Sequence, residues 1–298
     1  MKKCFIACFI LTTIFLFSIR GKVFGYQWQE NDGLDREIAL FQIPQRIVSL
    51  GPSLTEDLYL LGVGNRLIAN TTYCIRPPEA EQKEKIGSVI EVNIEKIVSL
   101  KPDLILTTSL TNPKKIKKLK ELGISVAEFP YAQNFSQLCE QFLELGIITG
   151  RENEADQIIR QAEYQVESIK TIIKNWPKPK VFIQVGANPL FTTVEDSFVH
   201  NFIEISGGIN IASGAKSGLY SREKVLSQNP DVILIVTMGI IGEEEKKIWG
   251  KYKTLNAVKN NRIYIIDSYN VCSPTPVSFV MVLWEILEIL HPDWRLYE

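Results

Sequence analysis

The sequence has few of the residues on which most enzyme and metal sites depend. It contains two histidines, His200 and His291, whereas a zinc or manganese site made only of protein ligands normally uses several imidazoles or thiolates. It has no Gly-x-Ser-x-Gly nucleophile motif and no Gly-Lys-Ser/Thr phosphate loop, and Gly62-Val-Gly64 lacks the third glycine of a dinucleotide loop. We therefore expect no free-metal site and none of these enzyme classes.

A long uncharged run occurs at the N-terminus. Two lysines precede Cys4–Ile19, which carries no charge. This run is shorter than the about 20 residues that cross a bilayer, and it is typical of an export signal. We predict a signal peptide at residues 1–25 and hence a periplasmic protein; an uncleaved membrane anchor is the alternative.

The predicted mature chain is mildly acidic. Removing residues 1–25 takes four of the 33 basic residues and none of the 34 acidic ones, so the net charge becomes −5. Such a protein has no electrostatic reason to bind nucleic acid or an anionic membrane surface.

Three of the five cysteines lie beyond the predicted signal: Cys74, Cys139 and Cys272. In an oxidising compartment, one pair and one remaining thiol is the simplest arrangement. Cys139 falls in an apolar helical pattern and is expected to be buried. Cys74 and Cys272 both follow apolar strands, and they form either a disulfide or two free thiols.

One long amphipathic helix is predicted at residues 151–176. Its apolar side chains recur every three or four residues, Gly150 precedes it and Pro177 ends it. At 1.5 Å per residue it would be about 39 Å long, enough to lie across two domains. We interpret it as a rigid backbone helix between two lobes, residues 44–150 and 177–298.

Nearly the same segment occurs on each side of this helix. Glu95–Leu106 and Glu223–Leu234 are identical at seven of twelve positions. Each predicts a short helix, a Pro-Asp turn and a buried strand, although many α/β proteins contain such units. A glutamate at the head of both copies favours duplication of a whole lobe.

Strands alternate with helices in both lobes, which predicts an α/β fold with two Rossmann-like lobes, each with a mostly parallel sheet covered on both faces. Ligands of such sheets bind at the loops beyond the carboxyl ends of the strands. In the first lobe these loops carry Ser53, which could also cap the helix that follows, Tyr73, Thr108 and Tyr131. We expect the strand ends of the two lobes to face each other across a ligand cleft.

Several motifs together resemble one known family. The chain is similar to the periplasmic substrate-binding proteins of metal-chelate ABC importers, and most of all to their vitamin B12-binding branch. The resemblance covers roughly residues 44–292. Its motifs are Arg46–Glu56, Tyr73 with Pro77-Pro78, Asn93–Asp103, Gly186–Thr193, Gly207–Ile211 and Ser221–Leu226.

The resemblance implies a function and a set of site residues. The protein would capture a chelate in the cleft and deliver it to a membrane permease dimer with its ATPase subunits, as a monomer with no intrinsic cofactor. Glu95 and Glu223 match the glutamates that dock onto permease arginines in the family. The residues expected to line the cleft are Ser53, Tyr73, Arg76, Thr108, Tyr131, Asn188, Phe191, Tyr220, Asp267 and Tyr269.

The chain also departs from the B12-binding branch. Where that branch has cleft tryptophans, this sequence has Val89, Thr108 and Leu219-Tyr220, and Cys272 begins the segment that carries an arginine there. Ser206 replaces a cysteine of the branch's second-lobe disulfide. The bound chelate could therefore be a corrinoid, a ferric siderophore or haem, with Arg76 or Arg222 as partners for an anionic group.

A different class of function fits the same fold. A cell-envelope enzyme or chelatase-like protein would use Asp267, Glu56 or His200 as acid-base groups and would not need the Glu95 and Glu223 pair. An importer's binding protein would instead bind reversibly, without turnover.

Overall fold

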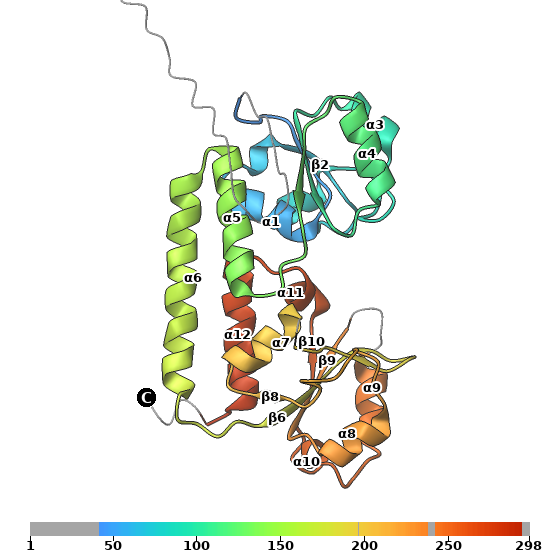
Figure 1. The fold of residues 1–298 in the computed structure, drawn as a ribbon, viewed down its shortest axis with the longest axis vertical. Helices are drawn as coiled ribbons and strands as arrows, with labels where there is room; N and C mark the ends of the chain where they lie inside the picture. Colours follow the sequence, from blue (N-terminus) through green and yellow to red (C-terminus); the bar gives the residue numbers. More distant parts are fainter. Residues whose placement is uncertain (1–41, 196, 238–241, 294–298) are drawn as a thin grey trace, which may run out of the picture. The chain divides into compact units, whose positions relative to one another are not determined.

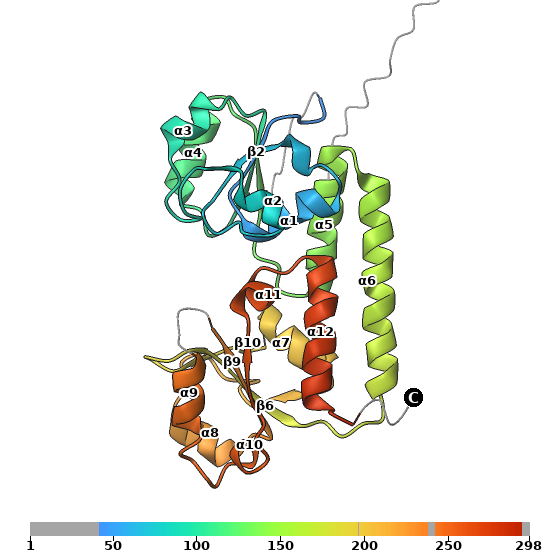
Figure 2. The same ribbon diagram turned by 180° about the vertical axis from the view of Figure 1, so that it is seen from behind.

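The computed structural model describes residues 42–195, 197–237 and 242–293, all within one compact unit (Figures 1 and 2). These residues form two α/β lobes, each built on its own sheet. No helix among them is long and apolar enough to span a bilayer. The predicted signal at residues 1–25 lies outside the described residues.

The first lobe contains a five-stranded sheet in the order β3-β2-β1-β4-β5, and all its strand pairs are parallel. The strands are β1 (Ile47–Ser49), β2 (Leu67–Asn70), β3 (Glu84–Lys85), β4 (Leu104–Thr108) and β5 (Val126–Phe129). The helical segments are α1 (Pro52–Leu60), η1 (Gly64–Arg66), α2 (Pro78–Glu81), α3 (Ile94–Ser99), α4 (Pro113–Glu121) and α5 (Phe135–Thr149).

Two apolar clusters cover the two faces of this sheet. Leu58 of α1 and Phe142 of α5 belong to one cluster, whereas Ile97 of α3 and Leu119 of α4 belong to the other. The inner strands β1 and β4 are buried on both faces, as their apolar runs predict.

The second lobe has a sheet in the order β10-β9-β6-β7, with β8 also paired to β6. Only β7 is antiparallel to its neighbour. The strands are β6 (Lys180–Gly186), β7 (Phe191–Thr192), β8 (Ile209–Asn210), β9 (Val232–Val236) and β10 (Ile263–Ile266). The helices are α7 (Phe198–Ile205), α8 (Arg222–Gln228), α9 (Gly242–Trp249), α10 (Asn256–Lys259), α11 (Ser268–Cys272) and α12 (Pro276–Leu290).

The repeated segment takes the same structure in both lobes. In each copy a short helix (α3 or α8) leads through a left-handed residue, Lys101 or Asn229, each with φ 48°, into a central strand. The aspartate that follows accepts hydrogen bonds from backbone amides at the start of the neighbouring strand. Asp103 bonds Arg46 N at 3.0 Å, and Asp231 bonds Lys180 N at 2.9 Å. The Pro-Asp turn therefore fixes where two parallel strands begin side by side.

The long helix α6 runs from Glu152 to Ile173. It is shorter at both ends than the predicted range. At its start, Gly150 takes a left-handed conformation at the end of α5 and separates the two helices. α6 packs against both α5 and α12, which lie roughly end to end along it (Figures 1 and 2). Its buried stripe consists of Ala155, Ile159, Ala162, Val166, Ile169 and Ile173.

These three helices connect the interiors of the lobes. One apolar cluster contains Ile47 and Leu106 of the first sheet, Val166 of α6, and Val181 and Val232 of the second sheet. The two lobes therefore share one hydrophobic core along their helical side.

Candidate functional site

The predicted cleft residues lie where the sheets end. Tyr73 and Arg76 follow β2, and Tyr131 follows β5. Asp267 and Tyr269 follow β10. Thr108 is the last residue of β4, Asn188 lies between β6 and β7, and Phe191 begins β7.

Large apolar side chains are exposed at these strand ends. In the first lobe Tyr73 is 61% exposed, Leu110 is 64% exposed and Tyr131 is 52% exposed. In the second lobe Phe191 and Leu219, which form a β-bridge, are also exposed. Groups of exposed apolar side chains often mark binding surfaces. These side chains suit a large, partly apolar ligand.

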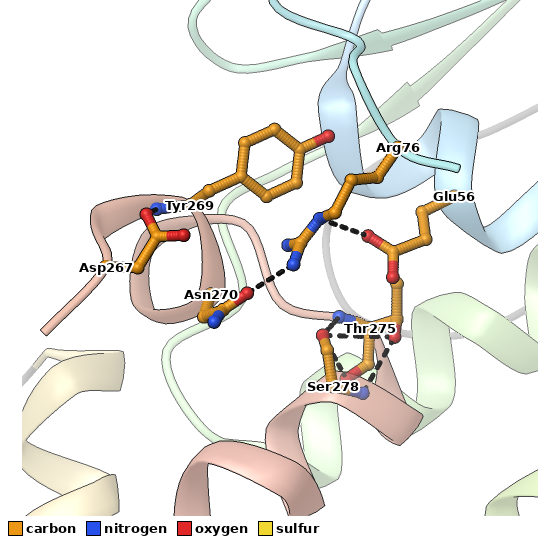
Figure 3. Close-up of polar contacts among 7 residues, drawn as sticks. All are labelled: Glu56, Arg76, Asp267, Tyr269, Asn270, Thr275 and Ser278. Atoms are coloured by element: carbon orange, nitrogen blue, oxygen red, sulfur yellow. Dashed lines mark hydrogen bonds and ion pairs between the residues drawn. The ribbon is translucent and has the colours of Figure 1, made fainter. Parts of the chain in front are cut away.

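Arg76 connects the two lobes (Figure 3). Its Nη1 donates a hydrogen bond to Oδ1 of Asn270, and its guanidinium carbon lies 3.9 Å from the centre of the Tyr269 ring. On its other side, Nε lies 3.6 Å from Oε2 of Glu56 on α1. Stacking on an aromatic ring and pairing with a carboxylate together fix the plane of a guanidinium. We call these four residues the arginine cluster.

Several polar atoms of the arginine cluster are buried without a hydrogen-bond partner. They are Nε and Nη2 of Arg76, Oε2 of Glu56 and the hydroxyl of Tyr269. Burial raises the pKa of Glu56 from its ordinary value, and the nearby Arg76 partly offsets that rise. Burial also raises the pKa of Tyr269 to about 12. Buried groups left unpaired are costly, so these atoms mark a place suited to bind a polar group.

The sequence did not single out Asn270, and it suggested Glu56 only as an acid-base group. Asn270 follows Tyr269 in α11, directly after the last strand, and this position at a strand end was a signal for a site residue. Glu56 lies on the helix that follows the Ser53 turn. Ser53 itself is a helical residue and not a cap: Gly51 holds the N-cap position of α1 and makes no side-chain cap, and Pro52 comes next.

Two predicted ligand contacts face inward. Tyr220 is 7% exposed, its hydroxyl donates to Ile211 O at 3.2 Å, and its ring packs against Phe182 in the core of the second lobe. It is therefore a core residue and not a cleft residue. Arg222, suggested as a partner for an anionic chelate, instead pairs with the buried Glu245 at 2.7 Å.

The three cysteines in the described part of the chain are free thiols, which corresponds to the predicted alternative without a bond between Cys74 and Cys272. Cys74 is fully buried, and its sulfur lies 3.2 Å from the hydroxyl of Thr71. Burial raises the pKa of Cys272 to about 11, so its reactive thiolate form is scarce at neutral pH. Cys139 is buried, as predicted.

The two predicted docking glutamates are exposed and occupy equivalent places. Glu95 is the second residue of α3, capped by Asn93, and Glu223 is the second residue of α8, capped by Ser221. Hydrogen bonds from the backbone and from Ser221 lower the pKa of Glu223. A carboxylate in the first turn also stabilises the helix through its dipole. Glu95 and Glu223 can therefore stabilise α3 and α8 as well as contact a partner.

The histidines take structural places. His291 follows α12, its Nε2 lies 3.1 Å from Ser206 O, and burial lowers its pKa. His200 Nδ1 lies 3.2 Å from the side-chain amide of Asn210. Within residues 42–195, 197–237 and 242–293, no three His, Cys, Asp or Glu side chains are grouped to hold a metal ion.

Two surface hollows lie away from the predicted cleft residues. One of about 460 Å³ is lined by Tyr59, Glu79 and Lys83, among others. The other, of about 370 Å³, is lined mainly by polar side chains, including His200 and Asn201. Asn201 also accepts a hydrogen bond from Phe135 N of α5 at 3.1 Å.

Two mostly parallel sheets in α/β lobes joined through a long helix, with binding groups at their strand ends, define the class of two-lobed solute-binding proteins. A family model described as "Periplasmic binding protein" matches residues 47–270, and the chain belongs to this family. The resemblance predicted from the sequence is thereby confirmed.

Two curated relatives are similar over most of the chain. The uncharacterized ABC transporter substrate-binding lipoprotein YvrC of Bacillus subtilis (strain 168) is 32% identical over 272 residues, covering 88% of this chain and 85% of the relative. A vitamin B12-binding protein of Vibrio cholerae serotype O1 is 26% identical over 235 residues, covering 78% of this chain and 84% of the relative.

Solved structures confirm the predicted fold of two lobes with a cleft between them. The apo periplasmic heme-binding protein RhuT from Roseiflexus sp. RS-1 superposes with a TM-score of 0.75 at 21% identity, covering 84% of this chain and 99% of that one. The chain is thus the solute-binding component of an ABC importer, a class that works with a permease and an ATPase.

Proposed function

We propose that the protein captures a metal chelate, either a corrinoid, haem or a ferric siderophore, between its lobes. The observation that carries this proposal is the group of exposed aromatic and aliphatic side chains at the strand ends of both lobes, Tyr73 and Phe191 among them. Arg76, which follows β2 and contacts Asn270 of the second lobe, adds a polar group at these strand ends. A large, mostly flat chelate with polar edges matches such a surface.

The relatives support this class of ligand. One is named for vitamin B12 and one solved structure for haem. In this proposal the chelate is cargo, the protein has no resident cofactor and it catalyses no reaction on the ligand. The cleft residues are those predicted from the sequence, without Tyr220 and with Glu56 and Asn270 added.

The proposal places the protein outside the cytoplasmic membrane as a monomer. Residues 1–25 act as the export signal, residues 44–150 and 177–298 as the two lobes, and residues 151–176 as the link that contains α6. Glu95 and Glu223 dock onto the permease, one from each lobe. Exposed ion pairs contribute only about 0 to 1 kcal/mol each, so they orient the complex more than they tighten it.

An absorption experiment tests the ligand class. Residues 26–298 are mixed with cyanocobalamin, haemin or a ferric siderophore, and free ligand is removed by gel filtration. We expect one chromophore to elute with the protein at a one-to-one ratio and to quench its tryptophan fluorescence. If none of the three elutes with the protein, the metal-chelate proposal is wrong and another solute class must be sought.

A further inference from the structure

The free hydrogen-bonding edge of Arg76 is the most unusual feature of the cleft. A guanidinium presents Nε–H and one Nη–H side by side, a pair that can grip a single acceptor group. In Arg76 this edge, formed by Nε and Nη2, is buried and makes no hydrogen bond, whereas Nη1 is already used by Asn270. The edge therefore lacks an acceptor.

An acceptor beside this edge is Oε2 of Glu56, and it also lacks a hydrogen bond. It lies 3.6 Å from Nε, which is close enough for an ion pair but longer than a hydrogen bond. The hydroxyl of Tyr269, whose ring lies against the same guanidinium, makes no hydrogen bond of good geometry either, although its interaction with Arg76 partly offsets the rise in its pKa. The place thus offers donors on Arg76, an acceptor on Glu56 and a hydroxyl that can do either.

The charges at this place limit what can bind there. The charges of Arg76 and Glu56 cancel. The residue next to Glu56 on α1, Asp57, is a second buried carboxylic acid. A ligand carboxylate would accept from Arg76 but would place a second negative charge against Glu56. A carboxamide would accept from Arg76 through its oxygen and donate to Glu56 through its NH₂ group, at no cost in charge.

The chain itself contains an example of the contact. The group that accepts from Arg76 Nη1 is the side-chain carboxamide of Asn270 (Figure 3). It shows that a carboxamide oxygen fits against this guanidinium while the ring of Tyr269 lies alongside.

We propose that Arg76, Glu56 and Tyr269 form a subsite for a peripheral carboxamide of the bound chelate, and that they select against a carboxylate at the same place. This inference rests on the proposed function. The four unpartnered atoms are covered by protein, so the carboxamide reaches them as the lobes part and then close on the ligand. Arg76 and Glu56 are positioned from the first lobe, and Tyr269 and Asn270 from the second.

The subsite distinguishes between chelate classes. Corrinoids carry amide side chains at their edges, whereas haem carries two carboxylates. The subsite therefore favours corrinoid-like ligands over haem at neutral pH, even though Tyr73 and Tyr131 would suit either ring.

Matched pairs of probes test the subsite. The pairs are cyanocobalamin with its monocarboxylic acids, and haemin diamide with haemin, and the dissociation constants are measured by fluorescence quenching at pH 7.5. We expect one amide form to bind at least about tenfold more tightly than its acid, a size typical of losing one buried polar contact. In Glu56→Gln the ratio should fall towards one or invert.

Two further variants serve as a charge control and as a second test of Arg76. Glu79→Gln removes a nearby exposed carboxylate and should leave the ratio unchanged. Arg76→Lys keeps the charge but loses the forked edge, so it should reduce the ratio even if Glu56→Gln does not fold. Circular dichroism checks folding in each variant.

The possible outcomes distinguish failure of the subsite from failure of the proposed function. If wild-type protein binds amide and acid forms equally, or prefers the acids, the subsite is rejected while the proposed function stands. An equal fall of the ratio in Glu79→Gln and Glu56→Gln also rejects it, because general charge would then explain the effect. If wild-type protein binds none of these probes or a ferric siderophore, the proposed function is rejected, and the subsite with it.

Discussion

The guanidinium of Arg76 donates a hydrogen bond to Asn270, a residue 194 positions further along the chain. It is a direct side-chain contact between the lobes, made on the ligand side of the shared helical core. The hydrogen bond therefore helps to hold the two lobes together at this place.

Loss of this contact should loosen the loops around it. In Asn270→Ala, Arg76 Nη1 loses its acceptor, and hydrogen bonds to charged groups are worth about 1.5 to 3 kcal/mol. We expect faster amide exchange in α11 and in residues 71–77, with a fall in melting temperature of about 2 °C or more. Hydrogen–deuterium exchange by mass spectrometry measures the first effect. Unchanged exchange at both segments would show that the contact does not hold the lobes.

Asp57 should make stability depend on pH. Burial, and then the neighbouring Glu56, raise its pKa well above the ordinary value of 3.8. Because the folded protein holds this proton more tightly than the unfolded chain, Asp57 favours folding below its ordinary pKa, and that contribution is lost as the pH rises through the raised value.

We therefore expect Asp57→Asn to increase the free energy of unfolding at pH 7.5 by about 1 to 3 kcal/mol, because the neutral amide avoids the cost of a buried carboxyl group beside Glu56. The gain should shrink towards zero at pH 4. Urea unfolding at both pH values measures it, with Asp293→Asn, at an exposed position, as control. A gain of equal size at both values would contradict the titration of Asp57.

The two docking glutamates should matter for transport and not for ligand capture. Charge reversal in Glu95→Lys with Glu223→Lys should abolish uptake in cells while leaving the dissociation constant of the chelate unchanged. Glu81→Lys with Glu163→Lys, also at exposed positions, makes the same change in net charge and should not affect uptake. Normal uptake in the Glu95 and Glu223 variant would contradict the docking assignment.

Two tyrosines should respond oppositely to substitution. Tyr220→Phe removes the hydrogen bond to Ile211 O inside the second lobe and should lower the free energy of unfolding by about 1 kcal/mol without changing chelate affinity. Tyr73→Ala removes an exposed ring and should weaken binding with little effect on stability. Calorimetric melting measures the stability of both variants, and fluorescence titration measures their affinity for the chelate. A loss of affinity in Tyr220→Phe would show that Tyr220 contacts the ligand.

Local patterns predicted the fold well, because each unit is encoded by neighbouring residues. The repeat at Glu95 and Glu223 anticipated two equivalent helix-strand units, and the apolar spacing anticipated α6. The role of the two repeated aspartates was not predicted. Their partners, at the starts of β1 and β6, lie 57 and 51 residues away in the sequence.

The site was harder to predict because its contacts join distant segments. Tyr220 lies near a strand end, as a cleft residue would, but the direction of its side chain depends on Phe182 and on the carbonyl of Ile211. Arg222 looked free because Glu245, its partner, lies on a helix 23 residues later. Asn270 and Glu56 are site residues because both contact Arg76, and these contacts form only in the folded protein.

The apolar cluster that runs from β1 through α6 to β9 makes the two lobes one cooperative unit. Neither lobe buries its own helices fully, so a fragment that ends within α6 would expose much of this interior and would not fold as half of the protein. For the same reason, the lobes cannot open widely about a free hinge when an ATP-driven partner acts on the protein. A small parting at the open edge is enough to loosen the side chains that hold the cargo, so release needs no large movement of either lobe.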